Sequence, residues 1–138
     1  MNDSSETLAA VLARIPYVAH LGVHAELAGD EMTAVLPFSE HLIGNPTLPA
    51  LHGGVIGGFM ELTAVIQLSI TEHRGGAPKP IDVTVEYLRS GRPVTTYARA
   101  EVKKVGRRIA NVQVEAWQDS RSAPIAALRG HFLVSPAD

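Results

Sequence analysis

PALHGGVIGGFMELTAVIQLSI, residues 49–70, is the stretch that decides the fold of this chain. After the proline it is apolar on nearly every side of a helix, which predicts a helix buried in a core rather than one resting on a surface. Two features do not help such a helix to fold. It would open with His52-Gly53-Gly54, and it would carry the carboxylate of Glu61 among apolar neighbours. Both features raise the question of what they serve.

Around this helix the sequence predicts one short helix and six strands. Residues 1–20 are expected to form an N-terminal helix, which Ser4 or Ser5 caps and Pro16 ends, followed by a linker. Residues 39–50 contain two prolines and predict a structured loop into the long helix, which ends near residues 73–76. Alternating apolar and polar residues predict strands in residues 22–29, 32–38, 81–89, 95–119 and 125–134, with turns at Gly29-Asp30 and Gly106.

These elements favour an α+β fold in which an antiparallel sheet wraps around the long helix, because a helix that is apolar nearly all round needs cover on most sides. A chain of 138 residues with 46% hydrophobic residues can bury one sizeable core, so we expect residues 1–138 to form a single domain. Large sheets with exposed edges tend to pair, which predicts a homodimer.

Composition excludes several classes of function. Without cysteine the chain has no disulfide and no cysteine-based zinc or redox site. The N-terminus lacks the basic segment of a secretory signal. The apolar run of residues 55–70 is interrupted by polar residues and is shorter than the roughly 20 residues of a membrane span. We therefore expect a cytoplasmic protein without a membrane partner.

The formal net charge of −2 argues against nucleic-acid binding. Its distribution is uneven, because residues 1–78 carry two basic and eight acidic residues, whereas residues 79–138 carry ten basic and six acidic ones. The second half of the chain could therefore face an anion. No glycine-rich nucleotide loop is present, and His20 and His24 straddle Gly22 near a strand start, so no metal site is expected.

The start of the long helix could bind an anion or a developing oxyanion. The first N–H groups of a helix lack partners within the helix and carry a partial positive charge, and Gly53 and Gly54 let a substrate approach the backbone. His52 could orient a carbonyl group or fix the loop by hydrogen bonding. The plain alternative is a tight corner between loop and helix. Gly57 and Gly58 each cost about 1 kcal/mol relative to alanine inside a helix, so a substrate, the sheet or a partner helix must lie close to them.

Glu61 has two interpretations. A carboxylate among apolar side chains is costly to bury unless it lines a reactive site or is paired, here with His52 or with an arginine of the sheet. Glu61 lies eight residues after Gly53, which is roughly 12 Å of helix rise, so one carbonyl group cannot touch both on a single helix. If both act on the same group, the site combines the helix start of one subunit with Glu61 of another.

This pattern resembles the hotdog-fold acyl-CoA thioesterases of the phenylacetate-pathway (PaaI) and 4-hydroxybenzoyl-CoA type, in which HGG opens the central helix and an acid follows nine positions after the His. His52 and Glu61 have that spacing, and the resemblance covers residues 22–134, including IDVTVEYLRSGRP and VGRRIANVQVEAW. It implies a hotdog fold and hydrolysis of an acyl- or aryl-CoA to free acid and CoA, with no cofactor other than the CoA of the substrate. It also implies dimers, which often pair into tetramers.

Carried over residue by residue, the resemblance implies that Glu61 attacks the thioester as a nucleophile or activates water as a general base. The Gly53 N–H would polarise the thioester carbonyl and hold the oxyanion, with Gly54 beside it and His52 supporting the loop. The identity of the acyl group would depend on a pocket shaped by Phe59, Met60, Leu62 and Tyr87.

The sequence departs from the family pattern at two polar positions. The Asn or Gln that often lies six positions before the His is replaced by Pro46, and Asn45 could take its role if the loop shifts by one residue. The Ser or Thr that some relatives place one turn after the acid is replaced by Val65. Water would then be positioned by other groups, such as Thr63 or Asn45, or be positioned less well.

The coenzyme A interpretation also gives the basic second half of the chain a role. Basic residues lie at predicted strand ends and turns, where they could meet the phosphates of CoA; solvated strand charges are the alternative for each of them. These residues are Arg89, Arg92, Lys103, Arg107 and Arg108.

Two other functions remain open. Residues 41–49, HLIGNPTLP, also resemble the HFPxxPxxP loop of hotdog-fold hydroxyacyl-thioester dehydratases, in which the acid follows the His by about fourteen residues. Glu61 follows His41 by twenty, and six extra residues turn a helical side chain by about 240°, so the two catalytic arrangements exclude each other. A non-catalytic acyl-CoA-binding module would use the same pocket without needing Glu61.

Overall fold

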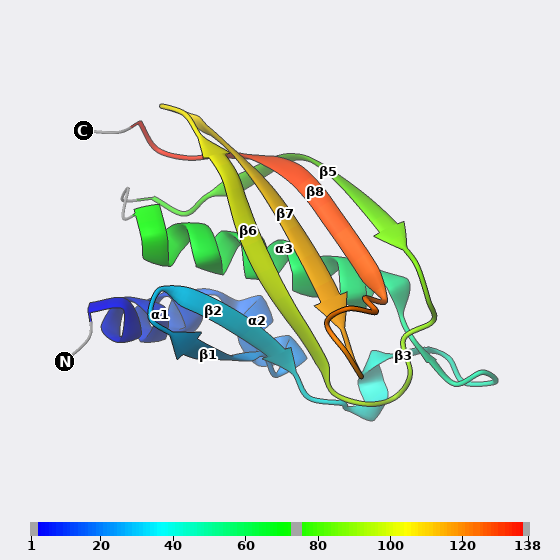
Figure 1. The fold of residues 1–138 in the computed structure, drawn as a ribbon. Helices are drawn as coiled ribbons and strands as arrows, with labels where there is room; N and C mark the ends of the chain where they lie inside the picture. Colours follow the sequence, from blue (N-terminus) through cyan, green and yellow to red (C-terminus); the bar gives the residue numbers. More distant parts are fainter. Residues whose placement is uncertain (1–2, 73–75, 137–138) are drawn as a thin grey trace.

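A six-stranded antiparallel sheet curves around the 20-residue helix α3 (Gly53–Glu72) in the computed structural model, which describes residues 3–72 and 76–136 (Figure 1). The strand order is β1-β2-β6-β7-β8-β5, so β5 forms one edge of the sheet. The predicted α+β fold, a sheet wrapped around a long helix, is confirmed. The strands are β1 (His24–Ala28), β2 (Glu31–Leu36), β5 (Lys79–Tyr87), β6 (Thr96–Val105), β7 (Ile109–Trp117) and β8 (Ala126–Leu133).

Helix α3 is buried on most sides because it has no continuous polar face. Phe59, Met60 and Ile66 are fully buried against the sheet. One narrow stripe, which includes Glu61 and Val65, is only partly covered. Within the described ranges, α3 is the one helix long and apolar enough to cross a membrane, and 56% of its apolar window is buried, as in the core helix of a soluble protein. A cytoplasmic location stays a prediction.

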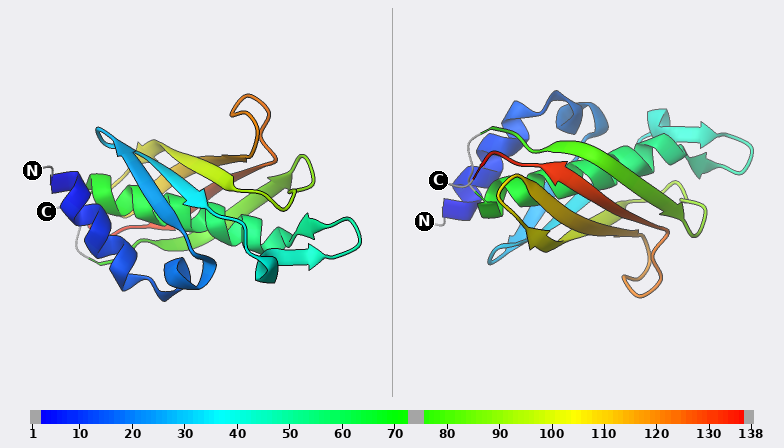
Figure 2. Two further views of the ribbon diagram at one scale, coloured as in Figure 1. Left: turned by 90° about the horizontal axis from the view of Figure 1, so that it is seen from below. Right: turned by 90° about the horizontal axis from the view of Figure 1, so that it is seen from above.

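The N-terminal segment forms two helices, α1 (Asp3–Arg14) and α2 (Pro16–Leu21). The prediction of a helix ended by Pro16 and followed by a linker was therefore incomplete, because Pro16 also begins the second helix. A proline is well placed in a first turn, where its missing N–H would have had no partner within the helix. Both views in Figure 2 show α1 beside the later half of α3.

The predicted hairpin between β1 and β2 is confirmed, since Ala28 pairs with Glu31 across Gly29, which has φ 66°. The β2 strand pairs with β6 only over residues 33–36, and beyond them the hairpin leaves the sheet. There Gln67 of α3 takes the place of a strand. Its Oε1 accepts a hydrogen bond from the Met32 N–H at 3.2 Å, and its Nε2 donates to the Asp30 carbonyl at 3.1 Å.

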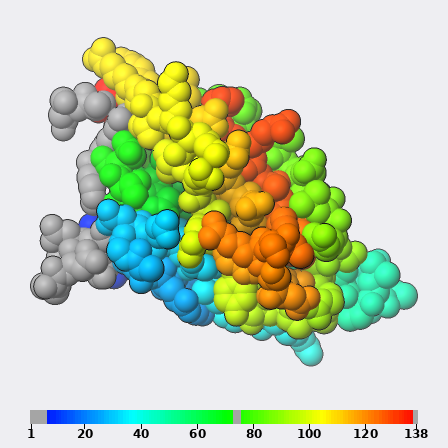
Figure 3. Space-filling model, in the orientation of Figure 1, coloured from blue at the N-terminus to red at the C-terminus, as the bar shows by residue number. Residues whose placement is uncertain are grey.

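The loop predicted in residues 39–50 contains its own secondary structure, namely the short 3-10 helix η1 (Glu40–Leu42) and a two-stranded hairpin of β3 (Ile43–Asn45) and β4 (Ala50–Leu51). The hairpin projects from the body beyond the start of α3 (Figure 3). Its base packs tightly on the helix start, because Gly44 has no side chain there; a Cβ on Gly44 would lie only 2.7 Å from the His52 Cα. The predicted end of α3 at residues 73–76 falls largely outside the described residues.

Candidate active site

His52 caps the start of α3. Its carbonyl accepts hydrogen bonds from the N–H groups of Val55 at 3.0 Å and Ile56 at 3.2 Å, and its Nδ1 accepts from the Gly54 N–H at 2.9 Å. The Nδ1 atom therefore carries no proton in this arrangement. A Cβ on Gly54 would lie 3.0 Å from that nitrogen, so a larger residue would push the imidazole away from the cap.

The Gly53 N–H is left as a free donor at the helix start. Throughout the described part of the chain it has no hydrogen-bond partner, while the residues before it are held by main-chain bonds. His52 N–H donates to the Leu42 carbonyl at 2.8 Å, and Leu51 N–H donates to the Gly91 carbonyl at 2.9 Å. A free N–H at a fixed helix N-terminus suits an oxyanion, because the helix dipole adds partial positive charge there.

Two tyrosines explain the glycines inside the helix. Tyr87, at the end of β5, donates from its hydroxyl to the Gly53 carbonyl at 2.7 Å, and a Cβ on Gly57 would lie 3.3 Å from the same hydroxyl. A Cβ on Gly58 would lie 3.1 Å from the hydroxyl of Tyr17 in α2. The close neighbours expected at Gly57 and Gly58 are thus the sheet and α2. The hydrogen bond between Tyr87 and Gly53 could not be predicted from the sequence, because the two residues are far apart in the chain.

Glu61 lies two turns beyond Gly53 on the side of α3 that includes Gly57, and it is partly buried. Across residues 3–72 and 76–136, its carboxylate makes no hydrogen bond and no ion pair. The alternative of a salt bridge with His52 or with an arginine of the sheet is therefore wrong for the described protomer. A carboxylate that is partly withdrawn from water and has no partner is available to a ligand.

Residues 48–125 match the thioesterase superfamily. The chain belongs to the thioesterase superfamily.

Several solved structures are similar to this chain. A Chromobacterium violaceum protein is 39% identical with a TM-score of 0.78, and the match covers 99% of this chain and 95% of that one. A Pseudomonas aeruginosa protein is 28% identical with a TM-score of 0.80, and the match covers 93% of this chain and 96% of that one. The Escherichia coli PaaI protein from the phenylacetic acid degradation operon is 16% identical with a TM-score of 0.80, and the match covers 96% of this chain and 93% of that one. At this identity the similarity concerns the fold only, and it confirms the hotdog fold. No curated protein matches the sequence significantly.

In this superfamily member the polar residues expected beside the site are not gathered within one protomer. Asn45 is exposed in the β3–β4 hairpin, where its side-chain oxygen accepts from the Thr47 N–H at 3.0 Å. Thr63 is fully buried, and its hydroxyl donates to the Phe59 carbonyl at 2.8 Å, so the expectation that it positions water is wrong. The hydroxyl satisfies its own helix backbone because apolar neighbours surround it.

The basic residues expected to meet CoA phosphates lie at opposite ends of the protein. Arg89 follows β5 beside the helix start, where Gly53, Tyr87 and Arg89 line an open hollow of about 410 Å³. Lys103, paired with Glu101 at 2.9 Å, lines a hollow together with Thr71 and Glu72 at the end of α3. The turn between β6 and β7, which includes Arg107 and Arg108, lies at the same end of the protein (Figure 1). Arg92 is paired with Asp119. One protomer therefore does not bring these groups together.

The thioesterase-superfamily fold also places most of the residues expected to shape an acyl pocket in the core. Phe59 and Met60 are 0% exposed and Leu62 is 8% exposed, so they fill the space between α3 and its neighbours. Tyr87, at 54% exposed, is the member of this group that reaches the surface beside the helix start. Helix periodicity alone could not show which side of an all-apolar helix stays open.

The dehydratase alternative loses support from the position of His41. Its Nδ1 lies 2.8 Å from the Ser39 hydroxyl, and its Nε2 lies 3.2 Å from the His20 carbonyl, so both ring nitrogens are engaged. These contacts tie η1 to α2. No hydrogen bond joins His41 to Glu61 among the residues that the structure covers.

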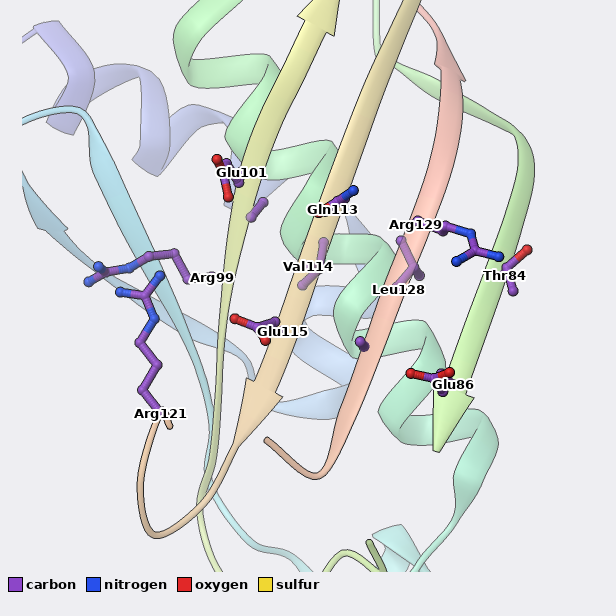
Figure 4. A pocket seen from close by; sticks show the side chains of 12 residues that line it. Thr84, Glu86, Arg99, Glu101, Gln113, Val114, Glu115, Arg121, Leu128 and Arg129 are labelled. Atoms are coloured by element: carbon purple, nitrogen blue, oxygen red, sulfur yellow. The ribbon is translucent and has the colours of Figure 1, made fainter. Parts of the chain in front are cut away.

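A second hollow of about 270 Å³ lies on the outer face of the sheet, away from α3 (Figure 4). Its charged lining is balanced, with three arginines and three glutamates, and it includes neither Gly53 nor Glu61. We therefore place the candidate site at α3 and not in this hollow. The charged residues are Arg99, Arg121, Arg129, Glu86, Glu101 and Glu115.

Proposed function

We propose that this protein hydrolyses the thioester bond of an acyl- or aryl-CoA to a free acid and coenzyme A. The observation that carries the proposal is that one side of α3 carries both the Gly53 N–H and the partly buried Glu61 carboxylate, and that neither group has a hydrogen-bond partner among the described residues. Membership of the thioesterase superfamily supports the same reaction. An oxyanion donor and a carboxylate are the groups that acyl transfer to water requires.

In the proposed reaction the thioester carbonyl oxygen accepts a hydrogen bond from the Gly53 N–H, which stabilises the negative charge that develops on that oxygen. Glu61 acts in one of two ways. As a general base it takes a proton from water while the water oxygen attacks the carbonyl carbon; as a nucleophile it forms an anhydride that water then cleaves. In both cases the carbon–sulfur bond breaks and the CoA thiolate leaves, to be protonated.

The proposed site combines two subunits. On one α3 the Gly53 N–H and Glu61 are separated by roughly 12 Å of helix rise, too far for a single carbonyl group. The edge strand β5 leaves Ile81 52% and Val83 38% exposed, which is an apolar edge suited to a second copy of the chain. Antiparallel pairing through β5 would lay the two α3 helices side by side in opposite directions, with Glu61 of one protomer facing Gly53 of its partner.

The same pairing supports the proposed CoA contacts. It would bring the end of the partner that carries Lys103, Arg107 and Arg108 toward Arg89, so cations that lie apart in one protomer could surround one nucleotide. The projecting β3–β4 hairpin with Asn45 would likewise reach across to the partner. A tetramer would form from two such dimers.

Glu61→Gln tests the proposal because it removes the charge with little change in shape. We expect thiol release from at least one member of a panel of short, medium, long and aryl acyl-CoAs, measured with a thiol-reactive dye. The variant should lose about a hundredfold or more in rate, the size typical of an acid–base group. Glu115→Gln, on the outer face of β7, is the matched control and should keep the wild-type rate.

Equal rates for wild type and Glu61→Gln would remove Glu61 from the mechanism. If wild type releases no thiol from any substrate, hydrolysis is wrong. A change in enoyl absorbance would then indicate a dehydratase, and a rise in melting temperature with acyl-CoA alone would indicate a binding module.

A further inference from the structure

The peptide group between Gly53 and Gly54 is held at both ends. Its carbonyl accepts a hydrogen bond from the Tyr87 hydroxyl at 2.7 Å, and its N–H donates to His52 Nδ1 at 2.9 Å. Because a peptide group is planar, two anchors at opposite ends restrict the rotation of its plane. The same carbonyl also accepts the helix bond from the Gly57 N–H, so side chains from β5 and from the preceding loop add to the hydrogen bonds that hold the first turn of α3.

This clamp acts next to the one donor of the turn that stays free. The N–H groups of Gly54, Val55 and Ile56 all have partners, whereas the Gly53 N–H has none in the described residues. The Gly53 N–H belongs to the neighbouring peptide group, which shares the Gly53 Cα with the clamped one. The carbonyl of that neighbouring group, at His52, accepts from the Val55 and Ile56 N–H groups and so holds the plane of the free N–H. A shift of the shared Gly53 Cα would move the free N–H together with this plane.

Two glycines make room for the phenol. A Cβ on Gly53 would lie 3.5 Å from the Tyr87 ring, and a Cβ on Gly57 would lie 3.3 Å from its hydroxyl, tighter than an ordinary contact. Tyr87 is 54% exposed, so burial in the core does not account for its place at the helix start. Its ring and hydroxyl lie against Gly53 and Gly57 on one side of α3.

We propose that Tyr87 is a positioning residue that fixes the direction of the Gly53 N–H. In thioester hydrolysis, which is the proposed function on which this role rests, Tyr87 acts through Gly53 and does not contact the reacting atoms. A donor aimed in advance at the developing oxyanion stabilises the transition state more than the bound substrate. Loss of the clamp should therefore lower kcat and leave KM nearly unchanged.

Tyr87→Phe removes only the hydroxyl. We expect kcat to fall about three- to tenfold, the size of one lost hydrogen bond, with KM changed less than about twofold. Tyr97→Phe is the matched control, because the Tyr97 ring stacks on Trp117 of β7 and not on α3, and it should behave as wild type. An unchanged kcat in Tyr87→Phe would overturn the proposal.

Gly57→Ala provides an independent way to displace the phenol hydroxyl. If it acts through Tyr87, its effect on kcat should largely disappear in the Tyr87→Phe background, since neighbours that share one interaction are not additive. Full additivity of the two substitutions would overturn the proposal.

Amide hydrogen exchange tests the clamp without any activity. In Tyr87→Phe the Gly54 N–H should exchange about three- to tenfold faster than in wild type, because its peptide group loses the hydrogen bond from Tyr87 to the Gly53 carbonyl. Tyr97→Phe should not change this exchange rate. Unchanged Gly54 exchange would overturn the proposal even in an active enzyme. If Gly54 exchange is faster in the variant but the wild-type protein releases no thiol, Tyr87 does hold the peptide group, and the proposed function is wrong.

Discussion

His52 shows how much one side chain contributes at the start of α3. Its imidazole supplies the cap that Ser, Thr, Asp or Asn usually supplies, since Nδ1 accepts from the Gly54 N–H. Gly44 and Gly54 both lie where a side chain would collide with His52. The position of the free Gly53 N–H therefore depends on a small set of contacts around one histidine.

Replacement of His52 should show how much its cap contributes to the stability of the protein. We expect His52→Ala to lower the free energy of unfolding by about 1 kcal/mol, because the helix loses its cap, whereas His52→Asn should keep most of it, since Asn caps well. Chemical denaturation followed by circular dichroism measures both. Equal losses in the two variants would show that the cap contributes little.

At the scale of elements, Gln67 joins α3 to the β1–β2 hairpin. The hairpin pairs with β6 only over residues 33–36, and beyond that point the Gln67 amide binds the Met32 N–H and the Asp30 carbonyl. Gln67 is 6% exposed, so water cannot easily replace its side chain. A polar residue in the core helix thus has a structural role in holding the sheet.

Gln67→Met should expose the cost of this junction. The substitution keeps the length of the side chain but removes the acceptor of the buried Met32 N–H, so we expect a loss of about 1 to 3 kcal/mol in unfolding free energy. Gln113→Met, on the exposed face of β7, should change it by less than about 0.5 kcal/mol. A similar small change in both variants would mean that the hairpin finds other partners. Thermal or denaturant unfolding decides between these outcomes.

At the scale of the whole molecule, the separation of Gly53 and Glu61 along one helix makes subunit pairing part of the proposed chemistry. The exposed apolar side chains of β5 supply a surface for that pairing. If the site is composite, each protomer contributes the donor to one site and the carboxylate to the other.

Mixing two inactive variants tests the composite site directly. Gly53→Pro removes the free N–H at a position where proline suits a helix, and Glu61→Gln removes the charge. Each variant should be inactive alone. After co-refolding, half of the dimers are mixed and each has one intact site, so we expect about a quarter of the wild-type rate. No recovery in a mixture shown by mass spectrometry to contain mixed dimers would mean that each site lies within one protomer.

The helices and strands could be predicted from local patterns in the chain. Alternation in β7 and β8, the apolar run of α3 and the turns at Gly29 and Gly106 are each determined by neighbours in sequence, because burial on one side selects a period of 2 or 3.6 residues. The spacing of Gly53 and Glu61 along α3 likewise followed from helix geometry. Two local predictions were incomplete. Pro16 begins a helix as well as ending one, and the loop predicted in residues 39–50 contains η1 and the β3–β4 hairpin.

Only the tertiary structure decided which residues far apart in the chain contact one another. The bond from Tyr87 to Gly53 and the bonds from the Gln67 amide to the β1–β2 hairpin depend on how the sheet curves around α3. So does the open stripe of α3 on which Glu61 lies without a partner. Local patterns specify which face of an element is apolar, but the packing of one element on another determines which side chains meet, because that choice depends on shape across the whole core.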